Sequence, residues 1–292
     1  MPELPEVETI TNDLKKSVLG YEISDFWTDS PTQILPNAIA VKKGIIAGKI
    51  IGVERLGKLI VFWVSWYSGI KALKQHFLGI HLKMSGRVFL RKKSDAPDKY
   101  CHAILTMRST KTDFNDPSYE LRFCDMRKFG YIRFYRNKEE LEKMVNTKLG
   151  PGPFDKKFTA SYLQDKFSGK NTTIKSALLN QRIISGIGNI YANEALFVAG
   201  IRPNKAVTYL NINVLKRLRT SIIKVLKQGI KHRGSSSKDE GYKDLFGNLG
   251  TYQKHFLVYE KKGKSCPNSC GGVIKYDKVS GRGTFWCEKC QR

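Results

Sequence analysis

The sequence predicts an α+β protein of two domains, a β-rich N-terminal half and a helical C-terminal half that ends in a metal-binding hairpin. Short runs rich in branched and aromatic residues recur between residues 21 and 136. Helical spacing of apolar residues dominates 159–231. Four of the six cysteines follow residue 265 in two closely spaced pairs. A length of 292 residues suits two ordinary domains.

The first six residues begin a predicted helix and suggest covalent chemistry. Removal of Met1 would leave Pro2 with a free secondary amine, which can attack a carbonyl-like carbon and form an iminium. Glu3 adjoins that amine and Glu6 follows one helical turn later, so an acid–base partner is available. The alternative is structural, with Pro2 and Pro5 starting the helix and the two glutamates complementing its dipole.

The N-terminal half is predicted to be an antiparallel sandwich or barrel. Helical spacing extends from Leu4 to Val18, and Gly20 ends this first helix. Polar segments at 92–99 and 109–118 are predicted to be hairpin loops. The predicted strands are 49–53, 57–64, 77–82, 87–90, 102–107, 119–123 and 131–135.

Glycines and prolines at 150–153 cannot continue a helix or a central strand, so 149–157 is a predicted linker. The domains are therefore 1–148 and 158–257, followed by a hairpin module at 258–292. Glycine-rich 233–250 is either a functional lid or a plain surface loop. Residues 256–259 are predicted to return to β structure. The predicted helices are 159–168, 173–181, 189–199 and 210–231.

The paired cysteines have the spacing of a structural zinc site. Two pairs bracket an insert of hairpin length and provide four thiolates for one tetrahedral Zn²⁺. Disulfide bonds are the alternative. The remaining two, Cys101 and Cys124, are predicted to be isolated, reduced core residues. The four predicted ligands are Cys266, Cys270, Cys287 and Cys290.

The charge balance points to a polyanionic partner. Lys and Arg total 51 against 26 acidic residues, a formal net charge of +25, and neutralisation of phosphates supplies much of the affinity for nucleic acid. A general lysine bias of the source organism is the alternative. We see no secretory signal and no apolar run long enough to span a membrane, so we expect a soluble, intracellular protein located with the DNA.

Six motifs in register resemble the formamidopyrimidine-DNA glycosylase / endonuclease VIII family. Leu4 favours the formamidopyrimidine branch, since the other branch typically has glycine there. Departures are the three residues between the first two hairpin cysteines, the added length near 66–76 and 109–118, and the unfamiliar 233–250 loop. The motifs are Pro2 to Thr9, His81 to Gly86, Asp125 to Gly130, Leu149 to Pro151, Gly186 to Glu194 and the terminal cysteine hairpin.

The resemblance implies a fold and a catalytic centre. The fold would be an N-terminal antiparallel β-sandwich with flanking helices and a helix–two-turns–helix domain ending in a β-hairpin zinc finger. Pro2 would be the nucleophile, Glu3 the general acid, and Glu6 would organise the site, while Lys58 would contact phosphates flanking the lesion. Residues 233–250 would cap the extruded base. Without the resemblance, Lys58 could equally be a lysine that protects the edge of a strand from pairing with another chain.

The resemblance also implies a DNA surface. Met84, Arg127 and Phe129 would enter the duplex where a nucleotide is extruded. Without the family, the two apolar residues would be core and Arg127 a surface cation. Further phosphate contacts would come from Lys175, Asn189 and Arg282, while Glu194 would line the catalytic cleft. The structural alternatives are a helix N-cap for Asn189 and a solvated carboxylate for Glu194.

The implied function is a bifunctional DNA glycosylase/AP lyase of base excision repair. It would excise oxidised purines such as 8-oxoguanine and formamidopyrimidines from damaged double-stranded DNA as a monomer, with one structural Zn²⁺. Two alternatives stay open. One is an endonuclease VIII-like enzyme for oxidised pyrimidines, and the other is a non-catalytic zinc-ribbon protein that only binds DNA.

Overall fold

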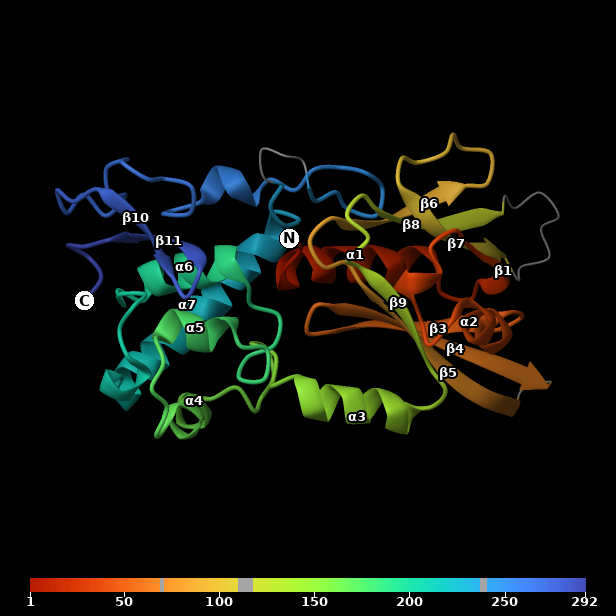
Figure 1. Ribbon diagram of the computed structural model, residues 1–292, viewed down its shortest axis with the longest axis horizontal. Helices are drawn as coiled ribbons and strands as arrows, with labels where there is room; N and C mark the ends of the chain where they lie inside the picture. Colours follow the sequence, from red (N-terminus) through yellow and green to blue (C-terminus); the bar gives the residue numbers. More distant parts are fainter. Residues whose placement is uncertain (69–70, 110–117, 237–240) are drawn as a thin grey trace. The chain divides into compact units, whose positions relative to one another are not determined.

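The computed structural model describes residues 1–68, 71–109, 118–236 and 241–292, which form two compact units (Figure 1). Unit 1 comprises Met1–Val145 and Arg233–Gly250, and unit 2 comprises Asn146–His232 and Thr251–Arg292. Residues 233–250, which the sequence alone placed with the helical domain, cluster with the β-rich half. The chain therefore returns to unit 1 after its longest helix.

The described strands of unit 1 form a nine-stranded sheet in the order β2-β9-β5-β4-β3-β1-β7-β8-β6. Neighbouring strands are antiparallel except β2 and β9, which are parallel. Every strand predicted for the N-terminal half is present, and the described parts of the added length at 66–76 lie within β4 and β5. The bounds are β1 Glu22–Thr28, β2 Ile34–Leu35, β3 Lys49–Leu56, β4 Leu59–Ser68, β5 Lys71–His81, β6 Gly86–Lys92, β7 Cys101–Arg108, β8 Tyr119–Asp125 and β9 Tyr131–Tyr135.

The N-terminal helix α1, Leu4–Ser17, lies in the core of this unit. Figure 1 shows β3–β5 and β6–β8 on two sides of α1. Val7, Ile10 and Leu14 are fully buried, and they share one apolar cluster with side chains from strands at both edges of the sheet. The apolar stripe read from the sequence therefore packs between two layers, as a sandwich with an internal helix requires.

Two helices and one connection in the N-terminal half differ from the sequence-based prediction. Helix α2, Ala38–Ile45, begins at Asn37, whose side chain accepts the N–H of Ala40. Helix α3, Lys138–Lys148, follows β9. The prediction of a hairpin loop at 92–99 is wrong, because β8 lies between β6 and β7. The buried Arg122 guanidinium of β8 donates to the carbonyls of Asp95 and Ala96 and so holds this crossing segment.

Unit 2 contains the four predicted helices. The longest, α7, has Asn211 as its N-cap and buries a stripe that includes Leu218 and Ile222. Short 3-10 turns lie at Pro31–Gln33 in unit 1 and at Val207–Tyr209 and Tyr252–His255 in unit 2. No helix among the described residues is long and apolar enough to cross a membrane. The bounds are α4 Ala160–Phe167, α5 Ile174–Leu179, α6 Asn189–Val198, α7 Ile212–Lys231, β10 Ile274–Val279 and β11 Arg282–Cys287.

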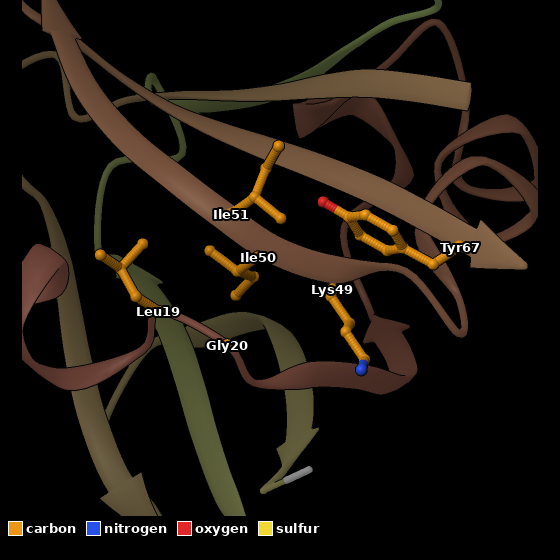
Figure 2. A pocket seen from close by; sticks show the side chains of 6 residues that line it. All are labelled: Leu19, Gly20, Lys49, Ile50, Ile51 and Tyr67. Atoms are coloured by element: carbon orange, nitrogen blue, oxygen red, sulfur yellow. The ribbon is translucent and has the colours of Figure 1, made fainter. Parts of the chain in front are cut away.

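Figure 2 shows an open groove of about 390 Å³ on unit 1. It contains one cation, Lys49, and no carboxylate, thiol or imidazole. None of the residues predicted to carry chemistry lines it, so its size alone does not make it a candidate active site. The lining residues are Leu19, Gly20, Lys49, Ile50, Ile51 and Tyr67.

Candidate active site and nucleic-acid interface

The N-terminus of α1 places Pro2, Glu3 and Glu6 together. Glu3 is the N-cap of the helix and forms a capping box with Glu6, whose Oε2 accepts the Glu3 N–H at 2.8 Å. All three residues are buried, and the positive end of the helix dipole favours both carboxylates. The helix-starting interpretation of this stretch is therefore correct, and the same capping box fixes two carboxylates at the helix start that Pro2 directly precedes.

The other oxygen of Glu6 binds the segment that follows α7. Oε1 accepts the N–H of Ser235 at 2.8 Å. Gly234 has φ +81°, and a Cβ there would lie 2.8 Å from the Glu6 Cγ, so glycine is required. The hydroxyl of Tyr242 also approaches the Glu6 carbonyl, at 3.4 Å. Ser235 and Tyr242 of the 233–250 segment thus contact α1, while 237–240 lie outside the described residues.

A charge cluster strengthens this attachment. The Arg233 guanidinium pairs with the carboxylates of Asp13 in α1 and Asp244, which are 7% and 1% exposed. These two carboxylates raise the pKa of Arg233 above its usual value. The sequence offered no local signal for this cluster, because its members lie far apart in the chain.

Lys58 lies in the turn between β3 and β4 and is 8% exposed. Gly57 before it has φ +61°, a conformation that favours glycine. The Arg55 guanidinium donates to the Glu8 carboxylate in α1 and to the Gly57 carbonyl, at 2.9 Å for the latter. The turn that carries Lys58 is therefore fastened to the helix that Pro2 precedes.

The predicted insertion residues lie on two adjacent loops. Met84 is 41% exposed and Phe129 is 53% exposed, so the interpretation of these residues as core is wrong. The Arg127 guanidinium lies over the Phe129 ring, 4.9 Å from its centroid. Apolar and cationic side chains thus project together from unit 1.

A buried carboxylate joins these two loops. Asp125 is fully buried, and its Oδ1 accepts the hydroxyl of Ser85 at 2.5 Å. Its Oδ2 accepts the N–H of Gly130 at 2.6 Å. Because Ser85 follows Met84 and Gly130 follows Phe129, one side chain organises both loops. Asp125 belongs to one of the six motifs, yet the sequence did not reveal this role.

The same loops border a cavity of about 260 Å³ in unit 1. His81, at the end of β5, stabilises the Met84 loop, because its Nδ1 accepts the N–H of Lys83 at 3.0 Å. Burial, assisted by the charges of Lys83 and Lys58, lowers the pKa of His81 to about 3. The imidazole is thus a neutral acceptor. The cavity is lined by Met1, Met84, Ser85, Arg87, Lys99, Tyr100, Cys124, Met126, Arg127 and Gly241.

In unit 2, Asn189 is the first residue of α6, and its N-cap is Gly188 rather than Asn189 itself. The Asn189 Nδ2 donates to the Gly283 carbonyl of the hairpin at 3.1 Å. Its Oδ1 is buried without a hydrogen-bond partner in the described part of the chain. Arg282, next to Gly283, is exposed. The helix N-terminus and the hairpin therefore meet at a cationic edge suited to an anion.

Lys175 differs from its predicted role. Its side chain is fully buried, and its Nζ donates to Thr284 Oγ1 at 2.6 Å and to the Gly283 carbonyl at 2.8 Å. The predicted phosphate contact is therefore not available to this ammonium group, which instead holds the hairpin against α5. A buried lysine needs such acceptors to offset the loss of hydration.

Glu194 also differs from its prediction. It is fully buried and neither lines an open cleft nor lies in solvent. Its Oε1 accepts the N–H groups of Val258 and Tyr259 at 3.0 and 2.8 Å, and its Oε2 accepts that of Leu257 at 2.8 Å. Burial raises the pKa of Glu194, against the effect of these donors. The predicted strand at 256–259 is absent because this carboxylate takes its N–H groups.

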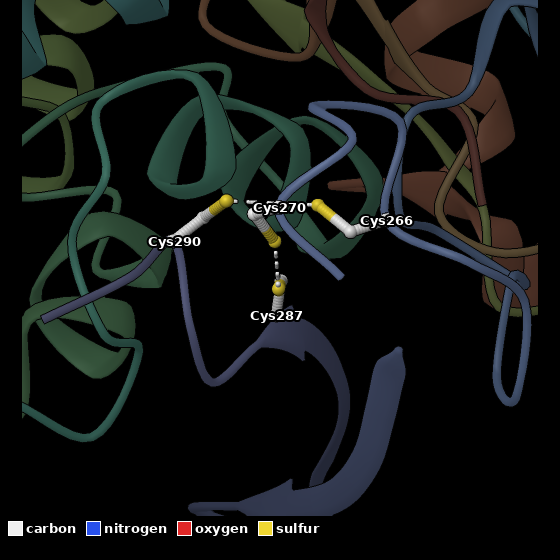
Figure 3. Close-up of side chains that lie close together, drawn as sticks. All are labelled: Cys266, Cys270, Cys287 and Cys290. Carbon is white, nitrogen blue, oxygen red and sulfur yellow. Dashed lines mark hydrogen bonds between the residues drawn. The ribbon is translucent and has the colours of Figure 1, made fainter. Parts of the chain in front are cut away.

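The four hairpin cysteines converge (Figure 3). Their sulfur atoms all lie within 4.8 Å of one another. Two pairs, Cys266–Cys290 and Cys270–Cys287, are separated by 3.6 and 3.5 Å. Sulfurs at the corners of a tetrahedron with metal–sulfur bonds of about 2.3 Å lie roughly 3.8 Å apart. The site can therefore hold one metal ion.

Comparison with known proteins agrees with this geometry. Residues 1–132 match the formamidopyrimidine-DNA glycosylase N-terminal domain, and residues 149–240 match the formamidopyrimidine-DNA glycosylase H2TH domain. Formamidopyrimidine-DNA glycosylase of Bacillus subtilis is 36% identical to the chain over 296 residues. That of Bacillus cereus is 33% identical over 293 residues. Each alignment covers 100% of this chain and 99% of the relative.

Solved structures agree over the full length. A complex of Lactococcus lactis Fpg with DNA containing an abasic site matches with a TM-score of 0.86 at 31% identity, covering 99% of both chains. MutM bound to DNA with carbocyclic 8-oxo-G matches with a TM-score of 0.84 at 32% identity, covering 100% of both chains. Both matched domains and the full-length relatives give the same answer: the chain belongs to the formamidopyrimidine-DNA glycosylase family.

Proposed function

We propose that this protein is a bifunctional DNA glycosylase and AP lyase of base excision repair, acting on oxidised purines in duplex DNA. The observation that carries the proposal is the position of Pro2 directly before the Glu3–Glu6 capping box, in a chain related to glycosylases over its whole length. A purine substrate is supported by the solved relatives, whose DNA contains carbocyclic 8-oxo-G or Fapy-dG.

The covalent step uses the amine that removal of Met1 exposes. The Pro2 nitrogen attacks C1′ of the damaged nucleotide, the bond from C1′ to the base breaks, and Glu3 protonates the sugar ring oxygen as the ring opens. The resulting iminium acidifies the C2′ hydrogen. β-Elimination and then δ-elimination release the 3′ and 5′ phosphates. Glu6 holds the Glu3 backbone in place for these proton transfers.

The loops of unit 1 take the place of the extruded nucleotide. Extrusion costs a few kcal/mol of stacking and pairing, and apolar Met84 and Phe129 can fill the vacated stack. The planar guanidinium of Arg127 can hydrogen-bond the base left unpaired. Asp125 keeps the loops together, so the three side chains are pre-organised for this task.

Phosphate groups are bound from both units. Lys58 in unit 1 contacts phosphates flanking the lesion. In unit 2, the positive end of the helix dipole of α6, which begins at Asn189, and the exposed guanidinium of Arg282 on the hairpin favour a bound phosphate. Lys175 contributes indirectly, by fixing the hairpin backbone from which Arg282 projects.

The metal ion is Zn²⁺, held by Cys266, Cys270, Cys287 and Cys290. Four thiolates leave no open coordination position, so the ion is structural and takes no part in catalysis. It stabilises a hairpin that is too small to fold by apolar burial alone. Metal analysis of the purified protein should return one zinc per chain.

Borohydride trapping tests the covalent mechanism. Sodium borohydride should reduce the iminium and link the protein to a duplex that contains 8-oxoguanine opposite cytosine. Pro2→Gly should abolish this adduct, while Pro5→Ala, which alters another proline of the same helix start, should retain it. Intact mass must show loss of Met1. An adduct that persists in Pro2→Gly, or full activity with Met1 in place, would overturn the proposal.

Competing duplexes test the substrate class. We expect faster excision of 8-oxoguanine and formamidopyrimidine than of thymine glycol at matched concentrations. The reverse order would favour the oxidised-pyrimidine alternative. Binding without excision of any of these bases would favour a protein that only binds DNA.

A further inference from the structure

Two cysteines outside the metal site face each other across adjacent strands. Cys101 in β7 pairs with Cys124 in β8, so the sequence-based description of these residues as isolated is wrong. The neighbouring N–H of Asp125 donates to the Tyr100 carbonyl at 2.8 Å. Because hydrogen-bonded and non-hydrogen-bonded pairs alternate along an antiparallel ladder, the cysteines occupy a non-hydrogen-bonded pair. Cα atoms at such pairs are roughly 4.5 Å apart, within the range of disulfides.

The two thiols are free and have different environments. The interaction with Cys124 lowers the pKa of Cys101, with help from the charge of the Arg122 guanidinium. The interaction with Cys101 and burial raise the pKa of Cys124. Cys101 is half-buried, whereas Cys124 is 3% exposed. This is the asymmetry of a reactive thiol with a resolving partner.

The pair is connected to the proposed insertion loops. Cys124 directly precedes Asp125, whose carboxylate holds Ser85 and Gly130. Cys124 also lines the 260 Å³ cavity together with Met84 and Arg127. A shift of the Cys124 backbone would therefore also move Asp125 and the two loops that its carboxylate holds.

We propose that peroxide converts Cys101 and Cys124 into a reversible disulfide that displaces the insertion loops and slows base excision. Opposed Cβ atoms in an antiparallel pair are about 4.5–5.5 Å apart, whereas a disulfide needs about 3.8 Å. Closure thus moves the strand end by roughly 1 Å, and a displacement of that size can lower an enzymatic rate by about 100-fold. The effect on excision rests on the proposed function, but formation of the disulfide does not.

The chemistry balances with hydrogen peroxide as the two-electron oxidant. The Cys101 thiolate attacks the peroxide, forming a sulfenic acid and releasing hydroxide. The Cys124 sulfur then attacks the Cys101 sulfur, its proton leaves with the sulfenic hydroxyl as water, and the disulfide forms. In total, two thiols and one peroxide give one disulfide and two waters. A dithiol reductant returns both thiols by exchange.

Peptide mapping of the zinc-loaded protein tests the disulfide directly. After graded hydrogen peroxide and alkylation, trypsin should yield residues 100–108 joined to residues 123–127, since each segment is bounded by lysine or arginine. Dithiothreitol should remove the linked peptide. Zinc release, followed with a metallochromic dye, identifies the peroxide dose at which the other four cysteines begin to react. Absence of the linked peptide below that dose would overturn the proposal.

The same samples test the regulatory effect. Excision of 8-oxoguanine by the oxidised wild type should fall at least about tenfold and recover with dithiothreitol, which does not reverse methionine oxidation at Met84 or Met126. Cys101→Ala should start at the wild-type rate and resist the same treatment. A linked peptide with an unchanged rate, or equal loss in Cys101→Ala, would refute the effect on excision. Inactive reduced protein would count against the proposed function, while the peptide map would still decide the disulfide.

Discussion

The carboxylate of Glu6 accepts the backbone N–H of Ser235 at 2.8 Å, joining positions 229 residues apart. The same carboxylate accepts the N–H of Glu3 through its other oxygen. One side chain therefore determines both the backbone beside Pro2 and the start of the 233–250 segment. In the proposed mechanism, the nucleophile and the lesion cap share this single support.

Replacing Glu6 by Gln tests that support. The amide NH₂ would face one of the two N–H donors, and a buried donor without an acceptor costs about 1–3 kcal/mol. We expect Glu6→Gln to remain folded but to excise 8-oxoguanine about 10–100 times more slowly. Single-turnover kinetics provide the measurement, with Glu139→Gln on the exposed face of α3 as the control. Equal rates in the two variants would contradict a supporting role for Glu6.

Loss of the Arg233 cation should destabilise unit 1. Arg233→Met would leave the carboxylates of Asp13 and Asp244 buried without their counter-charge. Because the Arg233 side chain is 43% exposed, we expect a decrease of about 2 kcal/mol in the free energy of unfolding by urea. Arg108→Met removes a cation that is 62% exposed from its pair with Glu22, which is 18% exposed, and should cost less than about 1 kcal/mol. Equal decreases in the free energy of unfolding for the two variants would show that burial of the Asp13 and Asp244 carboxylates is unimportant.

Glu194→Gln separates a structural role from a role in a catalytic cleft. The substitution removes one acceptor from the three N–H groups at 257–259 and should lower the unfolding free energy of unit 2 by about 1–3 kcal/mol. Glu288→Gln, in an exposed pair with Lys275, should have little effect. Unchanged stability combined with a large loss of excision would restore the cleft interpretation of Glu194.

His81 should make stability fall in acid. Its pKa of about 3 in the folded protein lies below the unfolded value near 6.5, so the unfolded chain binds the extra proton first. Its contribution is complete above pH 6.5 and is lost as the pH falls toward 3, by at most about 1.4 kcal/mol per pH unit. His81→Asn retains an acceptor for Lys83 and should flatten this dependence.

Urea unfolding between pH 4 and pH 7 measures the effect of His81. The control is Lys156→Asn, which replaces an exposed side chain in unit 2 by one that does not titrate. Wild type and Lys156→Asn should give parallel curves, and His81→Asn should lose less stability on acidification. Three parallel curves would mean that the His81 imidazole is protonated equally in the folded and unfolded chains.

Much of the architecture was predictable because it depends on local patterns. Strands such as 131–135 follow from branched and aromatic runs, and α1 follows from apolar residues at helical spacing. Helix α2 was missed although Asn37 is a recognisable cap, because it is a short helix within a strand-rich region. Residues 92–99 were wrongly predicted to be a hairpin loop, because strands that follow each other in the sequence need not be neighbours in the sheet.

Features that depend on adjacency in the chain could be predicted from the residues alone: Pro2 beside Glu3, and four cysteines at metal-binding spacing. The folded chain was needed to find the partners of Lys175 and Glu194, the attachment of Ser235 to Glu6, and the pairing of Cys101 with Cys124. A buried charge or thiol takes its role from the donors and acceptors that folding brings to it, and those groups come from distant parts of the chain.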